Sequence, residues 1–175
     1  MGTGIIVCGL NGSGKSTLGK ALAENTGFHF IDNENLYFPK TCPEYMYASA
    51  RSEKEVGELL LSEIKEHENF VFASVKGSYG ENILSYYQYA VLIEVPKDIR
   101  LQRVRNRSYQ KFGSRMLKGG DLYEREETFF DFVNSRPEND VEIWIQSLNC
   151  PVIRVDGTKP IKENVTFIIN QIKIL

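Results

Sequence analysis

Short apolar runs alternate with helical patterns along the chain. The apolar, often β-branched runs predict strands at residues 3–8, 28–31, 70–73, 90–95 and 152–155. Apolar residues at helical spacing predict helices at residues 15–24, from 52, at 96–107, at 141–148 and after 160. This alternation predicts parallel β-α-β units with helices on both faces of one sheet. Strands covered on both faces are apolar throughout, as these are.

One helix has a well-defined start. Ser52 and Glu55 form a Ser-x-x-Glu capping box, in which each side chain satisfies a backbone N–H of the other residue. The buried stripe predicted for this helix consists of Val56, Leu59, Leu60 and Ile64.

Composition narrows the class of protein. The 175 residues fit a single domain, residues 1–175. The net charge is −2, from 21 Lys and Arg against 23 Asp and Glu, and this balance argues against nucleic acid as a partner. No apolar run approaches the ~20 residues that a membrane helix needs, so we expect no membrane association.

The cysteines and the first residues favour a cytoplasmic protein. Cys8, Cys42 and Cys150 lie far apart and form no Cys-x-x-Cys pair, which argues against a disulfide framework or a zinc site. Residues 1–7 lack the basic segment and the long apolar run of a signal peptide.

A phosphate-binding loop follows the first predicted strand. Residues 9–16 match Gly-x-x-x-x-Gly-Lys-Ser/Thr, and a helix is predicted directly afterwards. Glycines let the backbone wrap around a phosphate, and the helix N-terminus adds partial positive charge. Lys15 is expected to reach the β- and γ-phosphates of ATP, and Ser16 to bind Mg²⁺. The expected nucleotide-binding residues here are Gly9, Asn11, Gly12, Ser13, Gly14, Lys15, Ser16 and Thr17.

Polar or flexible residues follow several predicted strands. In a parallel sheet of this kind, ligands bind at the carboxyl ends of the strands. We therefore expect one cleft to collect Gly9, Asp32, Ser74 and Asp156.

The chain resembles the adenylate-kinase-like group of small phosphate-loop kinases, which includes nucleoside monophosphate, shikimate and gluconate kinases. Four segments carry the resemblance, residues 9–17, 30–34, 95–107 and 155–160. The resemblance implies an α/β fold, a three-layer P-loop NTPase with a five-stranded parallel sheet in the order 2-3-1-4-5. It also implies an acceptor-binding insertion at about residues 33–68 and a lid at about residues 107–136. The family's AMP-binding and shikimate-binding motifs after the third strand are absent.

Two acidic residues lie where the family does its chemistry. Asp32 is expected to hold Mg²⁺ through waters, because the third strand ends without a carboxylate; alternatively it caps the next helix. By the resemblance, Glu34 contacts the acceptor hydroxyl and helps to remove its proton, and the alternative is a solvated first-turn residue.

The resemblance also assigns roles to basic residues. Arg103 packs near adenine, and Arg107 contacts phosphate. Arg115 lies in the lid, where closure over the γ-phosphate excludes water. The adenine loop contributes Gly157, Thr158 and Lys159, mainly through its backbone. Arg51 and Lys76 are candidates for an anionic acceptor, and a surface role fits them equally.

These features predict an ATP-dependent phosphotransferase that uses Mg²⁺ and acts on a small acceptor, either a nucleotide or a hydroxylated metabolite. The catalytic residues would be Lys15, Glu34, Arg107 and Arg115. The alternative is a nucleotide-binding regulator, or an ATPase without a small-molecule acceptor. A monomer and a homodimer are both compatible with the sequence.

Overall fold

A parallel sheet forms the centre of the molecule. The computed structural model describes residues 2–172, and its strands are β1 (Gly4–Cys8), β2 (His29–Asp32), β3 (Phe70–Ala73), β4 (Tyr87–Glu94) and β5 (Val152–Asp156). All neighbours are parallel, and the order is β2-β3-β1-β4-β5. The predicted five-stranded sheet and its strand order are confirmed.

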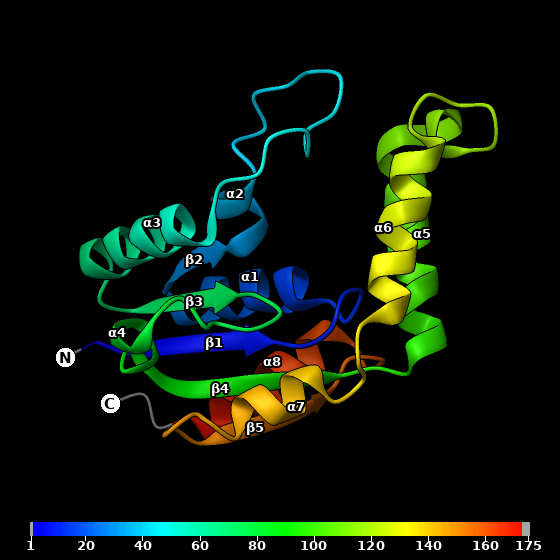
Figure 1. The fold of residues 1–175 in the computed structure, drawn as a ribbon. Helices are drawn as coiled ribbons and strands as arrows, with labels where there is room; N and C mark the ends of the chain where they lie inside the picture. The colour runs from blue at the N-terminus through cyan, green and yellow to red at the C-terminus, as the bar shows by residue number, and fades with distance from the viewer. Residues whose placement is uncertain (1, 173–175) are drawn as a thin grey trace.

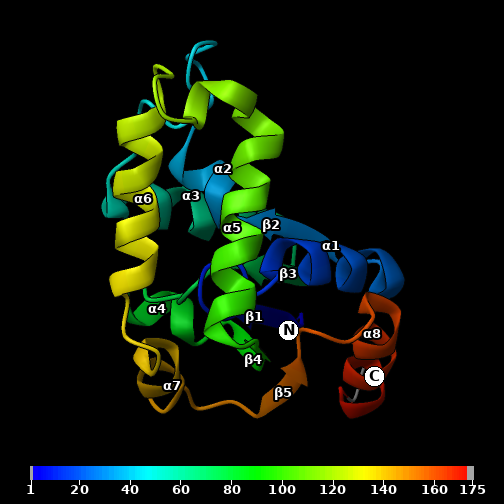
Figure 2. The same cartoon turned by 90° about the vertical axis from the view of Figure 1, so that its right-hand side faces the viewer.

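Helices cover both faces of the sheet (Figures 1 and 2). One face carries α3 (Glu53–Glu66), α4 (Glu81–Leu84) and α7 (Asp140–Ile145). The other face carries α1 (Lys15–Thr26) and α8 (Ile161–Gln171). Alternate residues of β1 serve the two sides: Ile6 and Cys8 join the first cluster, and Ile5 and Val7 the second. The inner strands β1 and β3 are apolar throughout because both of their faces are buried. The edge strand β5 instead alternates, with Ile153 and Val155 buried and Arg154 exposed.

A helical hairpin rises from the carboxyl ends of the strands (Figure 1). It consists of α5 (Lys97–Phe112), the short 3₁₀ helix η1 (Gly113–Met116) and α6 (Tyr123–Ser135). The hairpin has its own small core of Val104, Met116, Phe130 and Val133. Opposite it lie α2 (Asn33–Tyr37) and residues 38–52, here called the 38–52 loop.

Most predicted elements are confirmed with shifted ends. The capping box of Ser52 and Glu55 is present at the start of α3. The predicted buried stripe of α3 is wrong at Leu59, which is 38% exposed because it lies at the edge of the face that meets the sheet. Helix α5 extends beyond residue 107 to Phe112, so the first residues of the predicted lid continue this helix. No helix within residues 2–172 is long and apolar enough to cross a bilayer.

Candidate active site

The loop between β1 and α1 has the backbone of an anion-binding cradle. Gly12 and Gly14 have φ values of 81° and 96°, a left-handed conformation that favours glycine. Gly14 precedes α1 without a side-chain cap, so the first N–H groups of the helix point out of its end unsatisfied by the helix itself. Such N–H groups, together with the helix dipole, bind phosphate.

A buried arginine supports this loop from behind. Arg100 is 3% exposed, and its guanidinium donates to the carbonyl oxygens of Asn11 (3.3 Å) and Val95 (3.1 Å). It also forms a forked pair with both carboxylate oxygens of Glu138, at 2.8 and 2.7 Å. A Cβ on Gly12 would lie 2.3 Å from the Arg100 carbonyl oxygen, so the loop packs directly on α5. Arg100 therefore shapes the phosphate loop and does not line the cavity in front of it.

Lys15 lies over the loop. Its Nζ donates to the Leu10 carbonyl oxygen at 3.1 Å. Burial, followed by the positive charges of Arg107 and Arg136, lowers the pKa of Lys15 to about 8. A bound anion would offset the repulsion between these cations, so the arrangement is electrostatically suited to a polyphosphate.

Ser16 and Asp32 line the same cavity from α1 and from the end of β2. Asp32 caps α2: its Oδ1 accepts a hydrogen bond from the Glu34 N–H at 3.0 Å. Asp32 therefore caps the helix, as one of the two predicted roles required, and its Oδ2 remains available to another ligand. A hydroxyl and one carboxylate beside a phosphate cradle are the donor set that Mg²⁺ uses when it keeps several waters.

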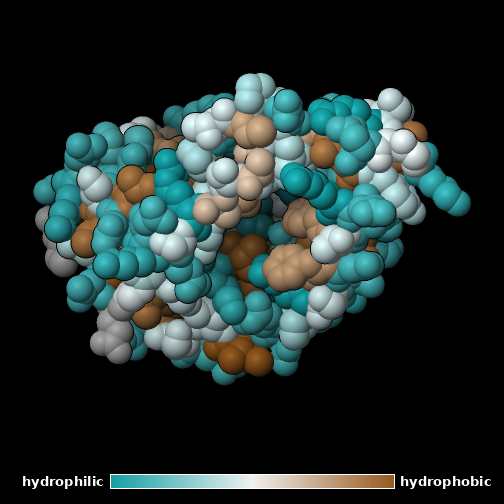
Figure 3. Space-filling model, turned by 45° about the horizontal axis from the view of Figure 1, so that its top comes forward, coloured by the Kyte–Doolittle hydropathy of each residue, from teal (hydrophilic) through white to brown (hydrophobic). Residues whose placement is uncertain are grey.

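A cavity of about 210 Å³ extends from the phosphate loop to the hairpin. Figure 3 shows a hollow in this face of the molecule, with apolar side chains beside its mouth. From the loop and the strand ends it is lined by Asn11, Gly12, Lys15, Ser16, Asp32, Ala73, Ser74 and Val75. From α2, the 38–52 loop and the hairpin it is lined by Asn33, Glu34, Tyr37, Phe38, Tyr45, Tyr47, Arg107, Ser108, Lys111, Glu126 and Phe129.

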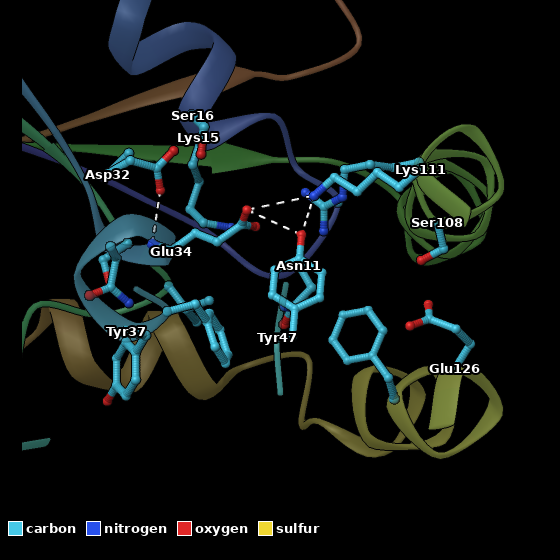
Figure 4. Close-up of a pocket in the computed structure, with 18 of the residues that line it drawn as sticks. Asn11, Lys15, Ser16, Asp32, Glu34, Tyr37, Tyr47, Ser108, Lys111 and Glu126 are labelled. Carbon is cyan, nitrogen blue, oxygen red and sulfur yellow. Dashed lines mark hydrogen bonds and ion pairs between the residues drawn. The ribbon is translucent and has the colours of Figure 1, made fainter. Parts of the chain in front are cut away.

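Glu34 lies at the junction of the two parts of the cavity (Figure 4). Its Oε1 lies 3.6 Å from Lys111 Nζ and 3.5 Å from Lys40 Nζ, and it accepts a hydrogen bond from the Tyr47 hydroxyl at 3.2 Å. Burial raises the pKa of Glu34, but Lys111, Arg107 and Lys40 outweigh it, and the net pKa lies below the ordinary value. Glu34 is therefore ionised at neutral pH. The same carboxylate and burial raise the pKa of Tyr47.

The three predicted arginines have different surroundings. Arg107 lines the cavity, and no carboxylate within residues 2–172 pairs with it. Arg103 donates to the carbonyl oxygens of Gly157 (3.0 Å) and Gly12 (3.5 Å), which connects the phosphate loop to the predicted adenine loop. Arg115 lies outside the cavity, where it pairs with Asp121 at 2.7 Å and donates to the Glu44 carbonyl oxygen at 3.0 Å.

The predicted adenine loop is a tight turn after β5. The Thr158 N–H and hydroxyl both donate to Asp156 Oδ1, at 2.8 and 2.6 Å. A Cβ on Gly157 would lie 2.5 Å from side-chain atoms of Ile93 and Val95. Lys159 pairs with Glu163 at 3.1 Å. The loop is thus fixed through its backbone, as expected of an element that acts mainly through main-chain groups.

The expected single cleft is only partly formed. Asp32 and Ser74 line the cavity, whereas Gly9 and Asp156 line other, shallower hollows near Val95. Thr17 is exposed on α1.

The two cations considered for an anionic acceptor already have protein partners. Arg51 donates to the Leu36 carbonyl oxygen at 2.7 Å, and Lys76 pairs with Asp140 at 2.8 Å.

Sequence reasoning missed most of the aromatic half of the cavity. Tyr45 and Tyr47 lie in the 38–52 loop, which has no periodicity to signal a role. Lys111 lies one turn after Arg107 on α5, at a spacing that could have identified it. Glu126 belongs to no sequence motif, and it reaches the cavity because α6 faces the 38–52 loop in the fold.

Comparisons with known proteins agree with this geometry. A family model described as an AAA domain (AAA_18) matches residues 5–131. The uncharacterized protein YqaC of Bacillus subtilis (strain 168) is 28% identical over 169 residues, which are 92% of this chain and 92% of that protein.

Solved structures show the same fold at low identity. A gluconokinase from Sinorhizobium meliloti 1021 is 19% identical with a TM-score of 0.52, over 94% of this chain and 87% of that chain. A shikimate kinase from Bacteroides thetaiotaomicron is 18% identical with a TM-score of 0.57, over 98% of this chain and 99% of that chain. The predicted resemblance to the adenylate-kinase-like group is confirmed in the fold, and the family match shows that this chain belongs to the AAA domain family.

Proposed function

We propose that this protein is an ATP-dependent small-molecule kinase, which transfers the γ-phosphate of Mg-ATP to an acceptor held below the hairpin. One observation carries the proposal. A single cavity joins the phosphate loop, through Lys15 and Ser16, to a chamber lined by Glu34. A nucleotide seated on the loop would direct its terminal phosphate toward that chamber.

The part of the cavity at the phosphate loop is suited to ATP, the phosphate donor. The loop N–H groups and Lys15 would bind the β- and γ-phosphates, and Arg107 would add a fixed positive charge beside the phosphate that moves. Arg103 and the loop at Gly157 would hold the adenine end. Ser16 and Asp32 would hold Mg²⁺, which when bound neutralises charge on the β- and γ-phosphates.

The acceptor side is suited to in-line transfer. A hydroxyl beside Glu34 would attack the γ-phosphorus, the bond from that phosphorus to the β-γ bridging oxygen would break, and ADP would leave. Glu34 is ionised, so it can accept the hydroxyl proton. Lys111, 3.6 Å from Glu34, keeps the carboxylate charged and directed into the cavity. The surrounding rings of the 38–52 loop would limit access of water.

The structural neighbours support a small acceptor. The names gluconokinase and shikimate kinase describe enzymes that phosphorylate small hydroxylated acids. A cavity of about 210 Å³ suits a ligand of that size better than a polymer. The three cysteines are free, which fits the reducing cytoplasm in which we place the protein.

The experiment is a measurement of ADP release from Mg-ATP with a panel of nucleosides, nucleotides and hydroxylated metabolites. The protein should release ADP faster when a true acceptor is present. Lys15→Ala should abolish both this activity and nucleotide binding. Lys20→Ala, which removes an exposed lysine from the same helix, should retain both. Nucleotide binding without acceptor-dependent ADP release would instead support a regulator or an ATPase.

A further inference from the structure

One carboxyl group in the cavity has an oxygen without a partner among the residues that the structure describes. Glu126 of α6 is 1% exposed, and its Oε1 accepts a hydrogen bond from the Tyr45 hydroxyl at 3.1 Å. Its Oε2 is buried and has no hydrogen-bond partner among the residues that the structure describes. Buried polar atoms are normally paired, because leaving one unpaired costs free energy. A residue that lines a cavity can recover this cost when a ligand brings the missing donor.

The surroundings of Glu126 are aromatic. Tyr45 and Tyr47 approach edge to face with ring centroids 5.6 Å apart, and Phe38 and Tyr47 do so at 5.0 Å. Phe129 lines the same part of the cavity, one turn along α6 from Glu126. Figure 4 shows the carboxyl group reaching in from α6 and the hydroxyl of Ser108 from α5. Apolar rings around one carboxyl group favour a ligand with a flat apolar body and a hydrogen-bond donor.

The distribution of charge in the cavity disfavours an acidic ligand at this end. Arg125 lies over the Tyr45 ring, with its Cζ 5.2 Å from the ring centroid, but it does not line the cavity. The cations of the cavity, Lys15, Arg107 and Lys111, gather around the phosphate loop and Glu34. No cation among residues 2–172 forms an ion pair with Glu126. A ligand carboxylate placed here would face the carboxyl group of Glu126 with no cation lining this part of the cavity, whereas an N–H donor would satisfy Oε2.

We propose that Glu126 is the specificity residue of the acceptor pocket and that it accepts an N–H hydrogen bond from the non-reacting end of the acceptor. Two sources share this chemistry: a ring with N–H donors, of the nucleobase type, and an amino group such as that of an amino sugar. In both cases the aromatic rings contact the body of the ligand, and its hydroxyl lies near Glu34. The proposal rests on the proposed function for the transfer step, but the binding of the acceptor can be measured without transfer.

The test is binding to the protein loaded with a non-hydrolysable ATP analogue and Mg²⁺. The probes are four ribonucleosides for the ring, glucosamine for the amino group, and gluconate and shikimate for hydroxylated acids. At least one N–H-bearing probe should raise the melting temperature, and the two acids should not. A shift with nucleosides alone assigns the ring, and a shift with glucosamine alone assigns the amino group.

Two variants attribute the effect to Glu126. Glu126→Gln keeps the shape of the side chain but leaves it one oxygen, which Tyr45 already occupies, so affinity for the bound probe should fall about tenfold or more. Glu124→Gln makes the same change of charge at an exposed position of α6 and should bind like the parent. Tyr45→Phe, which frees Oε1 and loosens the carboxyl group, should weaken binding to a smaller degree.

Four results would overturn the proposal. The first is stabilisation by the acids alone, and the second is the absence of any shift with the N–H-bearing probes. The third is a Glu126→Gln variant that binds its probe as tightly as the parent does. A large drop in the melting temperature of ligand-free Glu126→Gln would also contradict it, by showing a structural role instead. Failure of the proposed function would be a separate result, seen in the parent protein as no nucleotide binding or as no acceptor-dependent release of ADP.

Discussion

Lys111 on α5 and Glu34 on α2 form an ion pair within the cavity, with Nζ 3.6 Å from Oε1. This pair connects the hairpin to the segment after β2. It also determines the charge of the group that we expect to receive the acceptor proton. The pair was not visible in the sequence, where the two residues lie on separate predicted elements.

Substitution of Glu34 tests its role in transfer. Glu34→Gln should lower kcat by about 10- to 100-fold with little change in the affinity for ATP, because phosphoryl transfer depends more on positioning than on a base. The pKa of Glu34 lies below its ordinary value, so kcat should show no fall between pH 8 and pH 6 from protonation of this group. The measurement is a pH profile of acceptor-dependent ADP release. A parent profile that falls steeply as pH drops through 6 would contradict the assignment.

Lys15 should oppose stability in the absence of nucleotide. Its pKa is about 8 in the folded protein, against ~10.4 in an unfolded chain. Below pH 8 both states are protonated, and the folded state carries the full cost of the buried charge. Between pH 8 and ~10.4 the unfolded chain binds more protons, so this residue makes the free energy of unfolding rise with pH.

Lys15→Met should therefore be more stable than the parent at pH 7 and yet fail to bind ATP. The advantage in melting temperature should shrink as the pH is raised from 8 to 10. Lys20→Met serves as the control at an exposed position of α1. A variant that is less stable than the parent at pH 7 would show that the contact of Lys15 with the Leu10 carbonyl outweighs the cost of burial.

The strands and the phosphate loop could be predicted from the sequence because their signals are local. An apolar run such as residues 70–73 predicts a strand wherever it lies, and it matches β3. The loop at residues 9–16 is a contiguous motif whose backbone does the binding. The acceptor chamber is different, since it combines Tyr45, Lys111 and Glu126 from three segments that only the folded chain brings together.

In α6, the exposure of individual side chains was harder to predict from the sequence than the helix itself. In the sequence, the apolar residues Phe129, Phe130 and Phe132 predict the core of a helix within the lid at about residues 107–136. In the structure Phe130 is buried, Phe129 lines the cavity and Phe132 is 53% exposed. Phe129 and Phe130 both pack in the hairpin core, with ring centroids 6.0 Å apart, whereas Phe132 points away from it. Neighbouring positions of a helix point in different directions, so residues that cluster in the sequence need not share one face.

Arg100 should contribute to stability more than its cationic neighbours. Arg100→Ala removes a buried guanidinium that holds the Asn11 and Val95 carbonyl oxygens and leaves those groups unpaired. We expect a loss of about 2 kcal/mol or more in the free energy of unfolding, reduced from the value for a fully buried pair because Glu138 is half exposed. Lys97→Ala, which removes an exposed hydrogen bond to the Asn134 carbonyl oxygen at 2.9 Å and a contact with Glu138 at 3.9 Å, should cost about 1 kcal/mol or less. Urea unfolding of both variants measures the difference, and equal losses would contradict the supporting role of Arg100.

Gly157 should be the sensitive position of the loop after β5. Gly157→Ala places a methyl group against Ile93 and Val95, so the loop must move away from the strand. The affinity for ATP should fall about tenfold, which is ~1.4 kcal/mol. Lys159→Ala should leave it unchanged, because this side chain contacts Glu163 and not the cavity. Calorimetric titration with an ATP analogue measures both variants, and a normal affinity in Gly157→Ala would place the adenine elsewhere.

Arg107 and Arg115 were both predicted to be catalytic, and their surroundings suggest that they differ. Arg107 lines the cavity with no carboxylate partner among the described residues, so Arg107→Lys should lower kcat about 100-fold by removing a fixed guanidinium beside the moving phosphate. Arg115 is held by Asp121, and Arg115→Ala should change kcat less than about threefold, as expected for an exposed ion pair. Comparing kcat of the two variants also tests whether the hairpin moves during turnover. If Arg115→Ala lowers kcat as strongly as Arg107→Lys, the hairpin must swing during turnover so that Arg115 leaves Asp121 and reaches the phosphate. Asp121→Asn would then raise kcat by freeing Arg115, whereas it should have no effect if Arg107 acts alone.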